Sequence, residues 1–340
     1  MEASQLDQRV KRETRKKLGN GRSPETAEGN QRAQRRERDF KKGRGVLCKD
    51  PAVRYAFIDE ERQNYKVKTL CRVLKVSRSG FYKWKNRRES QREIRRQELL
   101  EKIHEIFDGS RKTYGSPRVH QKLLKCGIKV NKKTVERLMS KNNIAPKRKR
   151  RYKSTTDSRH KMPVSANVLD RKFEVSKSNE AWVGDITYVE TQEGWLYLAV
   201  FLDLFSRMVI GWAMADRIDA ELVVSAYEMG RSRRGSEGPA IIHSDRGSQY
   251  ASELFRTAIS KDDCEQSMSR KGNCWDNAVA ESFFGTIKSE LIYHHNFKTR
   301  KDAQLSIFEF IEIFYNKQRL HSSLNYLTPE EFELKGKKAA

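Results

Sequence analysis

The sequence has little that would suit a membrane or an oxidising compartment. Its longest apolar stretch, Leu196 to Phe205, is interrupted by Asp203 and is far too short to cross a bilayer. Residues 1–17 contain no apolar segment of the kind that a secretory signal needs. The 5 cysteines are scattered and form no Cys-x-x-Cys pair, which argues against a disulfide framework and a structural zinc site. We therefore expect a cytoplasmic protein without a membrane partner.

Acidic residues are scarce in the first half of the chain. Residues 1–170 contain 48 Lys and Arg against 20 Asp and Glu, whereas residues 171–340 contain 22 against 25. The formal net charge of +25 therefore originates in the first half. A basic half joined to a near-neutral half is typical of a nucleic-acid-binding protein that carries a second activity.

Large apolar residues are also scarce at the start of the chain. Residues 1–50 hold only seven Val, Ile, Leu, Met, Phe, Trp or Tyr, and these repeat at neither the helical nor the strand period. Such a segment cannot bury enough surface to offset its ordering entropy. We expect residues 1–52 to form a basic disordered arm.

Two helix-turn-helix patterns follow within residues 53–146. In the first, Leu70, Val73 and Leu74 predict an apolar stripe, and Ser77 or Ser79 can cap a short second helix rich in aromatic and basic residues. After a connecting helix at about Arg92–Phe107, the second pattern starts with Pro117 in a first turn, and its first helix ends at Gly127. Asn131 caps its second helix. The inward residues expected in this unit are Val119, Leu123, Leu124, Val135 and Leu138.

The basic side chains of these two units are the expected DNA contacts. They are Arg78, Lys83, Lys85, Arg87, Arg118, Lys132, Lys133 and Arg137. A polar helical hairpin without a ligand is the alternative, and the density of basic residues favours DNA binding. Residues 147–175 begin with the run KRKRRYK and are expected to be a solvated basic linker that can also contact phosphates.

From Trp182 the apolar pattern changes to that of an α/β domain. Strands are expected at Trp182–Thr191, at two segments between Gly194 and Met214 with a turn near Ser206, at Ala240–His243 and at Cys264–Ser269. Helices are expected at Ala220–Gly230, Ser252–Ser260, Trp275–Ile292 and Lys301–Tyr315. This order predicts a five-stranded mixed sheet with flanking helices over residues 176–335, followed by a tail at 336–340.

Three acids occupy unusual positions in this second half. Asp185 lies in mid-strand on an apolar face, where a carboxylate is costly unless it is paired or binds a metal. Asp245 directly follows a short strand, and Glu281 shares a helix arc with Asn277 and Lys288. Taken singly, each acid can be a cap or an ion-pair partner. Together they have the ligand type that two divalent cations about 3.5–4 Å apart require for cutting a phosphodiester.

The spacing of these acids and the sequences of the segments around them resemble those of a known family. Asp245 and Glu281 have 35 residues between them and Lys288 follows Glu281 by seven, which resembles the Asp–Asp–Glu transposases and retroviral-type integrases. The segments WVGDITYV, LDLFSRMVIGW, HSDRGSQY, SRKGNCWDNAVAESFFGTIKSEL and YNKQRLHSSLNYLTPEEF are similar to the insertion sequence three family of bacterial elements. The resemblance runs from about Arg54 to Phe332.

The resemblance implies a fold, a reaction and a cofactor. The fold would be multidomain, with an α-helical helix-turn-helix half followed by an α/β ribonuclease H-like catalytic domain. Asp185, Asp245 and Glu281 would be both the catalytic and the metal-binding triad, holding two Mg²⁺ ions, with Mn²⁺ as a substitute. The reaction would be cleavage at the element's ends and attack by the freed 3′-hydroxyl, without a covalent protein–DNA intermediate. The partners would be double-stranded DNA of the terminal repeats and target, in the nucleoid, and further copies of the chain assembled on it.

The first 50 residues depart from the family pattern, which joins a separate upstream product with a zipper to the catalytic product by frameshifting. Residues 1–50 contain no heptad repeat. In the segment DFKKGRGVLCKD, codons for Lys-Lys-Gly-Arg-Gly-Val can encode Lys-Lys-Ala-Ala-Ala-Phe in another frame. We hypothesise that these residues translate the upstream gene out of frame, and that the separate upstream product is a possible partner.

Three basic residues near the acids are further expected DNA contacts: Lys288, Arg270 and Lys271. For Lys288 the alternative is a solvated lysine paired with Glu281 or Glu290. At the level of function, the alternative to a transposase is a non-catalytic DNA-binding regulator derived from one. A tyrosine recombinase is disfavoured because the second half has no grouped Arg-His-Arg pattern around a tyrosine.

Overall fold

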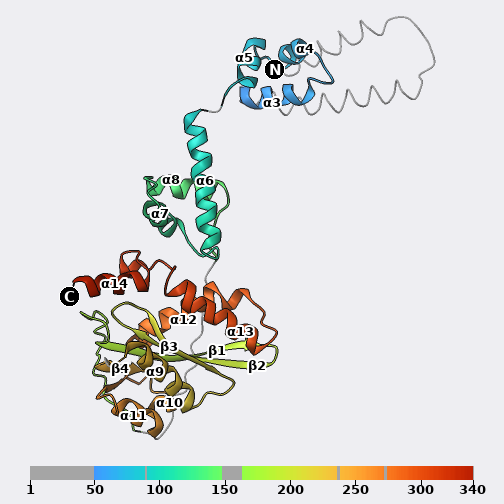
Figure 1. The fold of residues 1–340 in the computed structure, drawn as a ribbon. Helices are drawn as coiled ribbons and strands as arrows, with labels where there is room; N and C mark the ends of the chain where they lie inside the picture. Colours follow the sequence, from blue (N-terminus) through green and yellow to red (C-terminus); the bar gives the residue numbers. More distant parts are fainter. Residues whose placement is uncertain (1–49, 89, 148–162, 236–237, 272–273, 340) are drawn as a thin grey trace, which may run out of the picture. The chain divides into compact units, whose positions relative to one another are not determined.

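The computed structural model describes residues 50–88, 90–147, 163–235, 238–271 and 274–339 (Figure 1). The chain divides into two compact units, residues 1–94 and 95–340. The predicted arm at 1–52 lies almost entirely outside the described residues, as does the charged run that begins the linker. The division between the units falls inside the region 53–146 that the sequence groups as one DNA-binding part.

Within the described residues, the first unit has the helices α3 (Pro51–Glu61), α4 (Val67–Val73) and α5 (Arg78–Lys85), followed by the first turn of a further helix. Ser77 caps α5, because its hydroxyl accepts the Gly80 N–H at 3.0 Å. The core residues here are Ile58, Leu70, Cys71, Leu74 and Phe81. The predicted helix-turn-helix pair is present, but Val73 is 46% exposed and does not join the stripe. Leu70, Cys71 and Leu74 already span an arc of about 100°, and Val73 lies about 60° outside it.

The second unit begins inside the first helix of a trio, which consists of α6 (Gln91–Gly109), α7 (Ser116–Lys125) and α8 (Lys132–Lys141). Pro117 starts α7, and the Asn131 carboxamide accepts the Lys133 N–H at 2.9 Å to cap α8, as predicted. The expected inward residues are buried except Leu124, which is 40% exposed. Leu124 lies about 140° around the helix from Val119, outside the narrow arc that Val119 and Leu123 share.

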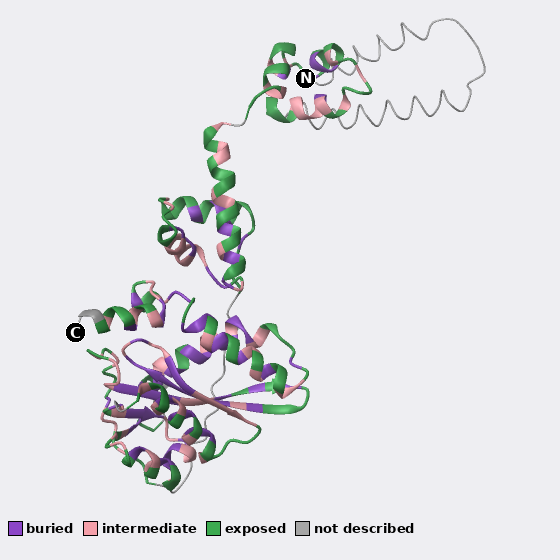
Figure 2. Ribbon diagram, in the orientation of Figure 1, coloured by how far each residue is buried: buried purple, intermediate pink, exposed green. Residues whose placement is uncertain are grey.

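The α/β part of the second unit is built on the predicted five-stranded mixed sheet, in the order β3-β2-β1-β4-β5. The strands are β1 (Ala181–Thr191), β2 (Gly194–Asp203), β3 (Val209–Ala215), β4 (Ile241–Ser244) and β5 (Glu265–Met268). β1, β2 and β3 pair antiparallel, whereas β4 and β5 run parallel to β1. Figure 2 shows the strands buried along most of their length. Apolar side chains therefore point to both faces of the sheet.

Helices cover the two faces. One face packs on α12 (Ala278–Glu290), α13 (Arg300–Phe308) and the π-helical continuation η3 (Glu309–Tyr315). The other packs on α9 (Ala220–Arg234), α10 (Ser248–Ala251) and α11 (Glu253–Ser260). Three short turns of 3-10 helix are η1 (Cys274–Asn277), η2 (Ile292–His294) and η4 (Ser322–Leu324).

Two predicted helices differ in detail from the structure. The helix expected from Trp275 starts with the 3-10 turn η1, and only from Ala278 is it α-helical. The helix expected over Lys301–Tyr315 changes to π geometry at Glu309. The last helix, α14 (Pro329–Ala339), continues past residue 335, which is the end of the α/β part predicted from the sequence.

Gly184 has a steric role in β1. It pairs with Phe201 of β2, and a Cβ at Gly184 would lie 2.6 Å from the Phe201 ring. The ring centre of Phe201 in turn lies 5.9–6.4 Å from the ring centres of Tyr227, Tyr250 and Phe255 beneath the sheet. A glycine is required here because the aromatic cluster fills the space beside it, directly before Asp185 in the chain.

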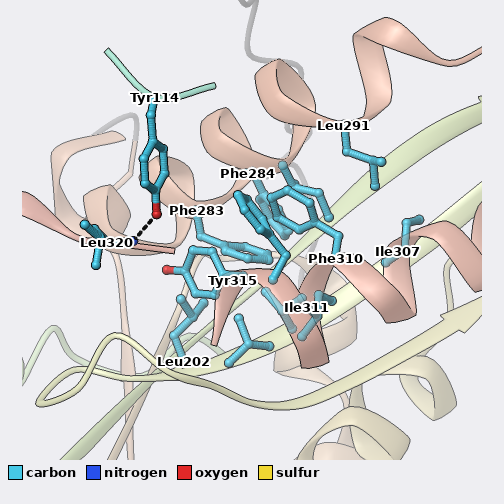
Figure 3. Packing of buried hydrophobic residues seen from close by; sticks show 14 of the residues in the cluster. Tyr114, Leu202, Phe283, Phe284, Leu291, Ile307, Phe310, Ile311, Tyr315 and Leu320 are labelled. Carbon is cyan, nitrogen blue, oxygen red and sulfur yellow. Dashed lines mark hydrogen bonds between the residues drawn. The ribbon is translucent and has the colours of Figure 1, made fainter. Parts of the chain in front are cut away.

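The helical trio α6–α8 is fastened to the α/β part. The Tyr114 hydroxyl accepts the Leu320 N–H at 2.8 Å and donates to the Gln318 carbonyl at 3.1 Å (Figure 3). Arg111 binds Glu309 at 2.6 Å and lies 5.2 Å from the Phe314 ring centre. Val119, Leu123 and Tyr114 belong to the same buried cluster as Phe283, Phe310 and Tyr315. The second helix-turn-helix-like unit is therefore packed as part of the larger body.

Candidate active site

Asp185 and Asp245 are brought together by parallel strand pairing. The register of β1 and β4 places Val183 beside His243, so two residues further on Asp185 and Asp245 occupy corresponding positions. Asp245 directly follows β4, where the chain leaves the sheet. Each carboxylate is oriented by a backbone amide: Ile186 N–H donates to Asp185 at 2.8 Å, and Gly247 N–H donates to Asp245 at 2.9 Å. The carboxyl ends of parallel strands are the usual place for ligands in α/β sheets.

Glu281 reaches the same place from α12. Its helix packs on the β1 face that carries Val183 and Val189, through Ala280, Phe283 and Ile287. Glu281 itself is exposed at the edge of that contact. Partial desolvation by the neighbouring helix and sheet atoms still raises the pKa of its carboxyl group. The sequence prediction that Glu281 lies beside the sheet-facing arc therefore agrees with the packing.

The pKa of Asp185 depends on the charges of the two other acids. Burial raises the pKa of Asp185 well above its ordinary value, and the negative charges of Asp245 and then Glu281 raise it further. The Ile186 N–H and the Lys288 ammonium oppose this rise. Asp185 thus lies within electrostatic range of both other acids and of the lysine. Such a carboxylate is stable in its charged form only with a positive partner.

Lys288 is buried rather than solvated. Only 5% of it is exposed, and its ammonium lies 5.3 Å from the centre of the Tyr188 ring. Burial lowers its pKa to about 8, against the raising effect of Asp185. Glu290, one of the partners considered for it, is instead held by Arg319 at 2.7 and 2.8 Å. The alternative is therefore wrong about the solvated environment of Lys288, whereas its pairing with Glu281 stays a prediction.

Four polar groups fix the turn η1 that precedes α12. Asp276 is fully buried and accepts hydrogen bonds from Arg270, Arg171 and Asn167 at 2.8–3.0 Å. The Arg270 hydrogen bonds hold the pKa of Asp276 well below its usual range. The next residue, Asn277, donates to the Gly184 carbonyl at 3.4 Å and so connects α12 to β1 beside Asp185.

Divalent cations suit this donor set. The acids supply hard oxygen ligands, and a cation would neutralise the repulsion among Asp185, Asp245 and Glu281. Within the described ranges, no three His, Cys, Asp or Glu side chains converge to hold a single ion. Asp185, Asp245 and Glu281 are the acids whose oxygens could bind such a cation.

The predicted DNA contacts fall into two groups. Exposed ones are Arg78, Lys83, Lys132, Lys133, Arg137 and Lys271. Others are engaged within the protein: Lys85 binds Asp59 at 3.0 Å, Arg87 binds Glu93 at 3.3 Å, Arg118 lies 3.7 Å from Glu290, and Arg270 binds Asp276. A hollow of about 770 Å³ on α5 is lined by Gly80, Tyr82, Lys83, Trp84, Asn86 and Arg87. DNA binding by these residues stays a prediction.

Two residues near the triad were not assigned to the site from sequence. The buried Tyr250 has its pKa raised by burial and then by the charges of Asp185 and Asp245, so it lies near both acids. Asn277 was placed on the arc of Glu281 but given no role. The signal for Asn277 was its spacing of four residues before Glu281, whereas nothing in the sequence distinguishes Tyr250 from a core aromatic.

Comparisons with known proteins match the chain in two regions. Residues 175–274 and 262–329 each match a family model described as an integrase core domain, and residues 94–152 match an HTH-like domain. Over 285 residues the chain is 40% identical to the transposase InsF for insertion sequence IS3A of Escherichia coli (strain K12), across 83% of this chain and 99% of that protein. It is 42% identical over 267 residues to the insertion element IS600 uncharacterized 31 kDa protein of Shigella sonnei, across 78% of this chain and 98% of that protein.

Solved structures show weaker likeness. One is the HTLV-2 integrase catalytic core domain in complex with magnesium, at a TM-score of 0.36 and 18% identity, across 46% of this chain and 97% of that one. Another is a simian T-cell lymphotropic virus intasome, at a TM-score of 0.41 and 19% identity, across 52% of this chain and 60% of that one. No helix within the described ranges has both the length and the apolar character to span a membrane.

Proposed function

The chain belongs to the IS3 family of bacterial transposases, and we propose that it cuts DNA at the ends of its insertion sequence and joins the freed 3′-hydroxyls to target DNA. The observation that carries this proposal is the half-buried Asp185, which lies within electrostatic range of Asp245 and Glu281 where β4 ends beside β1. A regulator that only binds DNA would gain nothing from this costly grouping of like charges. The regulator is therefore not favoured.

In this proposal the three acids hold two Mg²⁺ ions, for which Mn²⁺ can substitute. When bound, the two ions activate the attacking oxygen and stabilise the leaving oxygen of the phosphodiester. Asp185 is held by the Ile186 amide and Asp245 by the Gly247 amide, so both carboxylates are oriented before the cations arrive. Preorganised ligands of this kind need little rearrangement during the reaction.

Lys288 supplies the site's own positive charge. Its ammonium is partly desolvated and lies within electrostatic range of Asp185. A positive group in such an environment interacts more strongly with a phosphate than a solvated lysine would. We expect it to stabilise the phosphate next to the scissile bond, which keeps Lys288 among the proposed DNA contacts. The exposed basic residues of α5 and α8 would bind the rest of the duplex, and further copies of the chain would assemble on it.

The triad is tested by removing its charges one at a time. Asp185→Asn, Asp245→Asn and Glu281→Gln should each reduce strand cleavage below detection, because each removes a metal ligand. DNA binding should stay nearly unchanged, because the basic helices are intact. The assay is Mg²⁺-dependent cleavage of DNA carrying the element's own ends, with gel-shift binding measured in parallel.

A matched control is Glu253→Gln, which alters an acid in the first turn of α11. Its cleavage rate should equal that of the wild type. Undiminished cleavage by any one triad variant would remove that residue from the proposed triad.

A further inference from the structure

Asn277 is a buried carboxamide with one unsatisfied atom. The residue is 5% exposed, and its amide nitrogen donates to the Gly184 carbonyl at 3.4 Å. No hydrogen-bond donor in the described part of the chain reaches its Oδ1. Turning the amide over would bring two oxygens together at Gly184, so the nitrogen must face that carbonyl. A buried acceptor without a partner is unfavourable, and its presence calls for a ligand that donates to it.

The usual structural roles of a buried asparagine do not account for Oδ1. Asn277 occupies the N-cap position of α12, yet its side chain makes no capping hydrogen bond. Elsewhere in the same domain, the buried Asn316 has both amide atoms satisfied: Nδ2 donates to the Val209 carbonyl at 2.9 Å, and Oδ1 accepts the Val209 N–H at 3.0 Å. The contrast shows that this fold can satisfy a purely structural asparagine completely.

The position of Asn277 places its side chain near the carboxylates. Asn277 is the N-cap residue of α12, and Glu281 lies in the first turn of that helix. Its amide nitrogen is bonded to the residue directly before Asp185. Two other buried side-chain oxygens without hydrogen-bond partners are also nearby: Thr187 Oγ1, two residues beyond Asp185 on the same face of β1, and Tyr250 Oη. Unsatisfied oxygens are thus concentrated around the acids.

We propose that Asn277 is a fourth oxygen-bearing residue of the cation site, whose Oδ1 accepts a hydrogen bond from the hydration shell of the divalent cation. Mg²⁺ keeps several water molecules when carboxylates bind it, and these waters donate hydrogen bonds to neighbouring oxygens. A neutral carboxamide accepts such a bond without adding to the negative charge around Asp185. This inference rests on the proposed function, because it requires that the triad binds a cation.

The test measures cation binding by its effect on thermal stability of the full chain, without DNA. The melting temperature is followed as Mg²⁺ or Mn²⁺ is titrated, because a cation that binds only the folded state raises it. Asn277→Ala should raise the half-saturating cation concentration about tenfold, as expected for one lost hydrogen bond to a charged group. Without cation, Asn277→Asp should lower the melting temperature, because the new carboxylate repels the acids. Its added charge should also lower the half-saturating cation concentration.

Asn316→Ala is the matched control: it should lower the melting temperature but leave half-saturation as in the wild type. If Asn277 only holds Gly184 in place, both of its variants will lower the melting temperature and leave half-saturation unchanged, which would overturn the inference. The inference would also be overturned if the Ala and Asp variants raised the half-saturating cation concentration by the same factor. If the wild type shows no cation-induced stabilisation, the cation part of the proposed function fails and this inference with it. If the wild type is stabilised while the variants respond like it, only this inference fails.

Discussion

Lys288 is the one basic side chain buried beside the triad among the described residues, and burial opposes its charge. Its pKa of about 8 in the folded state is lower than the value of 10.5 expected when it is solvated. At pH 7 the ammonium is charged in both states, so the folded state bears the whole penalty of the lowered pKa. A residue kept at such a cost is typical of a functional site.

We predict that Lys288→Met separates stability from activity. The free energy of unfolding at pH 7 should rise by about 1–3 kcal/mol, because the buried charge is removed and the apolar stem is retained. The lower end allows for the lost attraction to Asp185 and the lost contact with Tyr188. End joining should fall strongly. Urea denaturation and a strand-transfer assay measure the two effects. Wild-type strand transfer by the Met variant would show that Lys288 has only a structural role.

His321 makes the folded state sensitive to acid. Burial lowers its pKa well below 6.5, and the positive charges of Arg319, Arg118 and Arg207 lower it further. Its Nε2 faces the Arg319 guanidinium at 3.3 Å, a position suited to an unprotonated nitrogen. Below pH 6.5 the unfolded chain takes up a proton on this residue that the folded chain does not, so stability falls as the pH decreases toward the folded pKa.

In His321→Gln the loss of stability between pH 6.5 and 4.5 should therefore be smaller than in the wild type. The slope of the free energy of unfolding against pH is the relevant measurement, because the substitution also changes packing against Tyr315 at every pH. His104→Gln, on the exposed surface of α6, should keep the wild-type slope. The buried His243, whose pKa burial lowers to about 4, should contribute to the acid sensitivity that remains. Parallel curves for wild type and His321→Gln would contradict the assignment.

At the scale of elements, α12 is fixed at both ends. Near its start Asn277 binds β1, and at its end Glu290 forms a buried, two-pronged ion pair with Arg319. Arg118 of α7 approaches the same carboxylate at 3.7 Å. The helix that carries Glu281 and Lys288 is therefore held by the helical trio as well as by the sheet.

Glu290→Gln should lower the free energy of unfolding by about 3–5 kcal/mol, because it leaves the Arg319 guanidinium buried without a carboxylate. The double variant Glu290→Leu with Arg319→Met should recover most of that loss, since it removes both charges together. Chemical denaturation of the three proteins checks this. A loss below about 1 kcal/mol in Glu290→Gln would mean that the pair is solvated in solution.

For the whole molecule, the boundary between the compact units predicts how the chain tolerates truncation. Residues 1–94 hold 27 Lys and Arg against 13 Asp and Glu, so their removal takes away much of the positive charge. A fragment of residues 95–340 should fold with near wild-type stability, bind the element's ends more weakly, and show a shallower dependence of affinity on salt. A fragment of residues 171–340 should be far less stable, because it exposes the surface around Leu320 on which Tyr114 packs.

Salt titrations of binding and thermal melts of the two fragments measure these effects. The proposed assignment of DNA binding to the basic helices would be contradicted if residues 171–340 alone bound the ends as tightly as the full chain. Equal stability of the two fragments would show instead that the docking of α6–α8 contributes nothing in solution.

Most elements, and the positions of the three acids within them, could be predicted from the sequence, whereas the helices α3, α10 and α14 were not expected. Strand alternation around Asp185, the strand end before Asp245 and the helical period around Glu281 are local properties, and each can be followed over about ten residues. The caps at Ser77 and Asn131 were predictable for the same reason, since a capping side chain acts on amides two or three residues away.

The environment of these residues, in contrast, depends on contacts between elements that are distant in the sequence. The burial of Lys288, the pairing of Arg270 with Asp276 and the packing of Tyr114 on Leu320 each join segments from different elements. The unsatisfied oxygen of Asn277 is likewise visible only once β1 has been placed beside α12. Local periodicity shows which face of an element is apolar, but how deeply a polar group on its edge is covered depends on chain segments far away in the sequence.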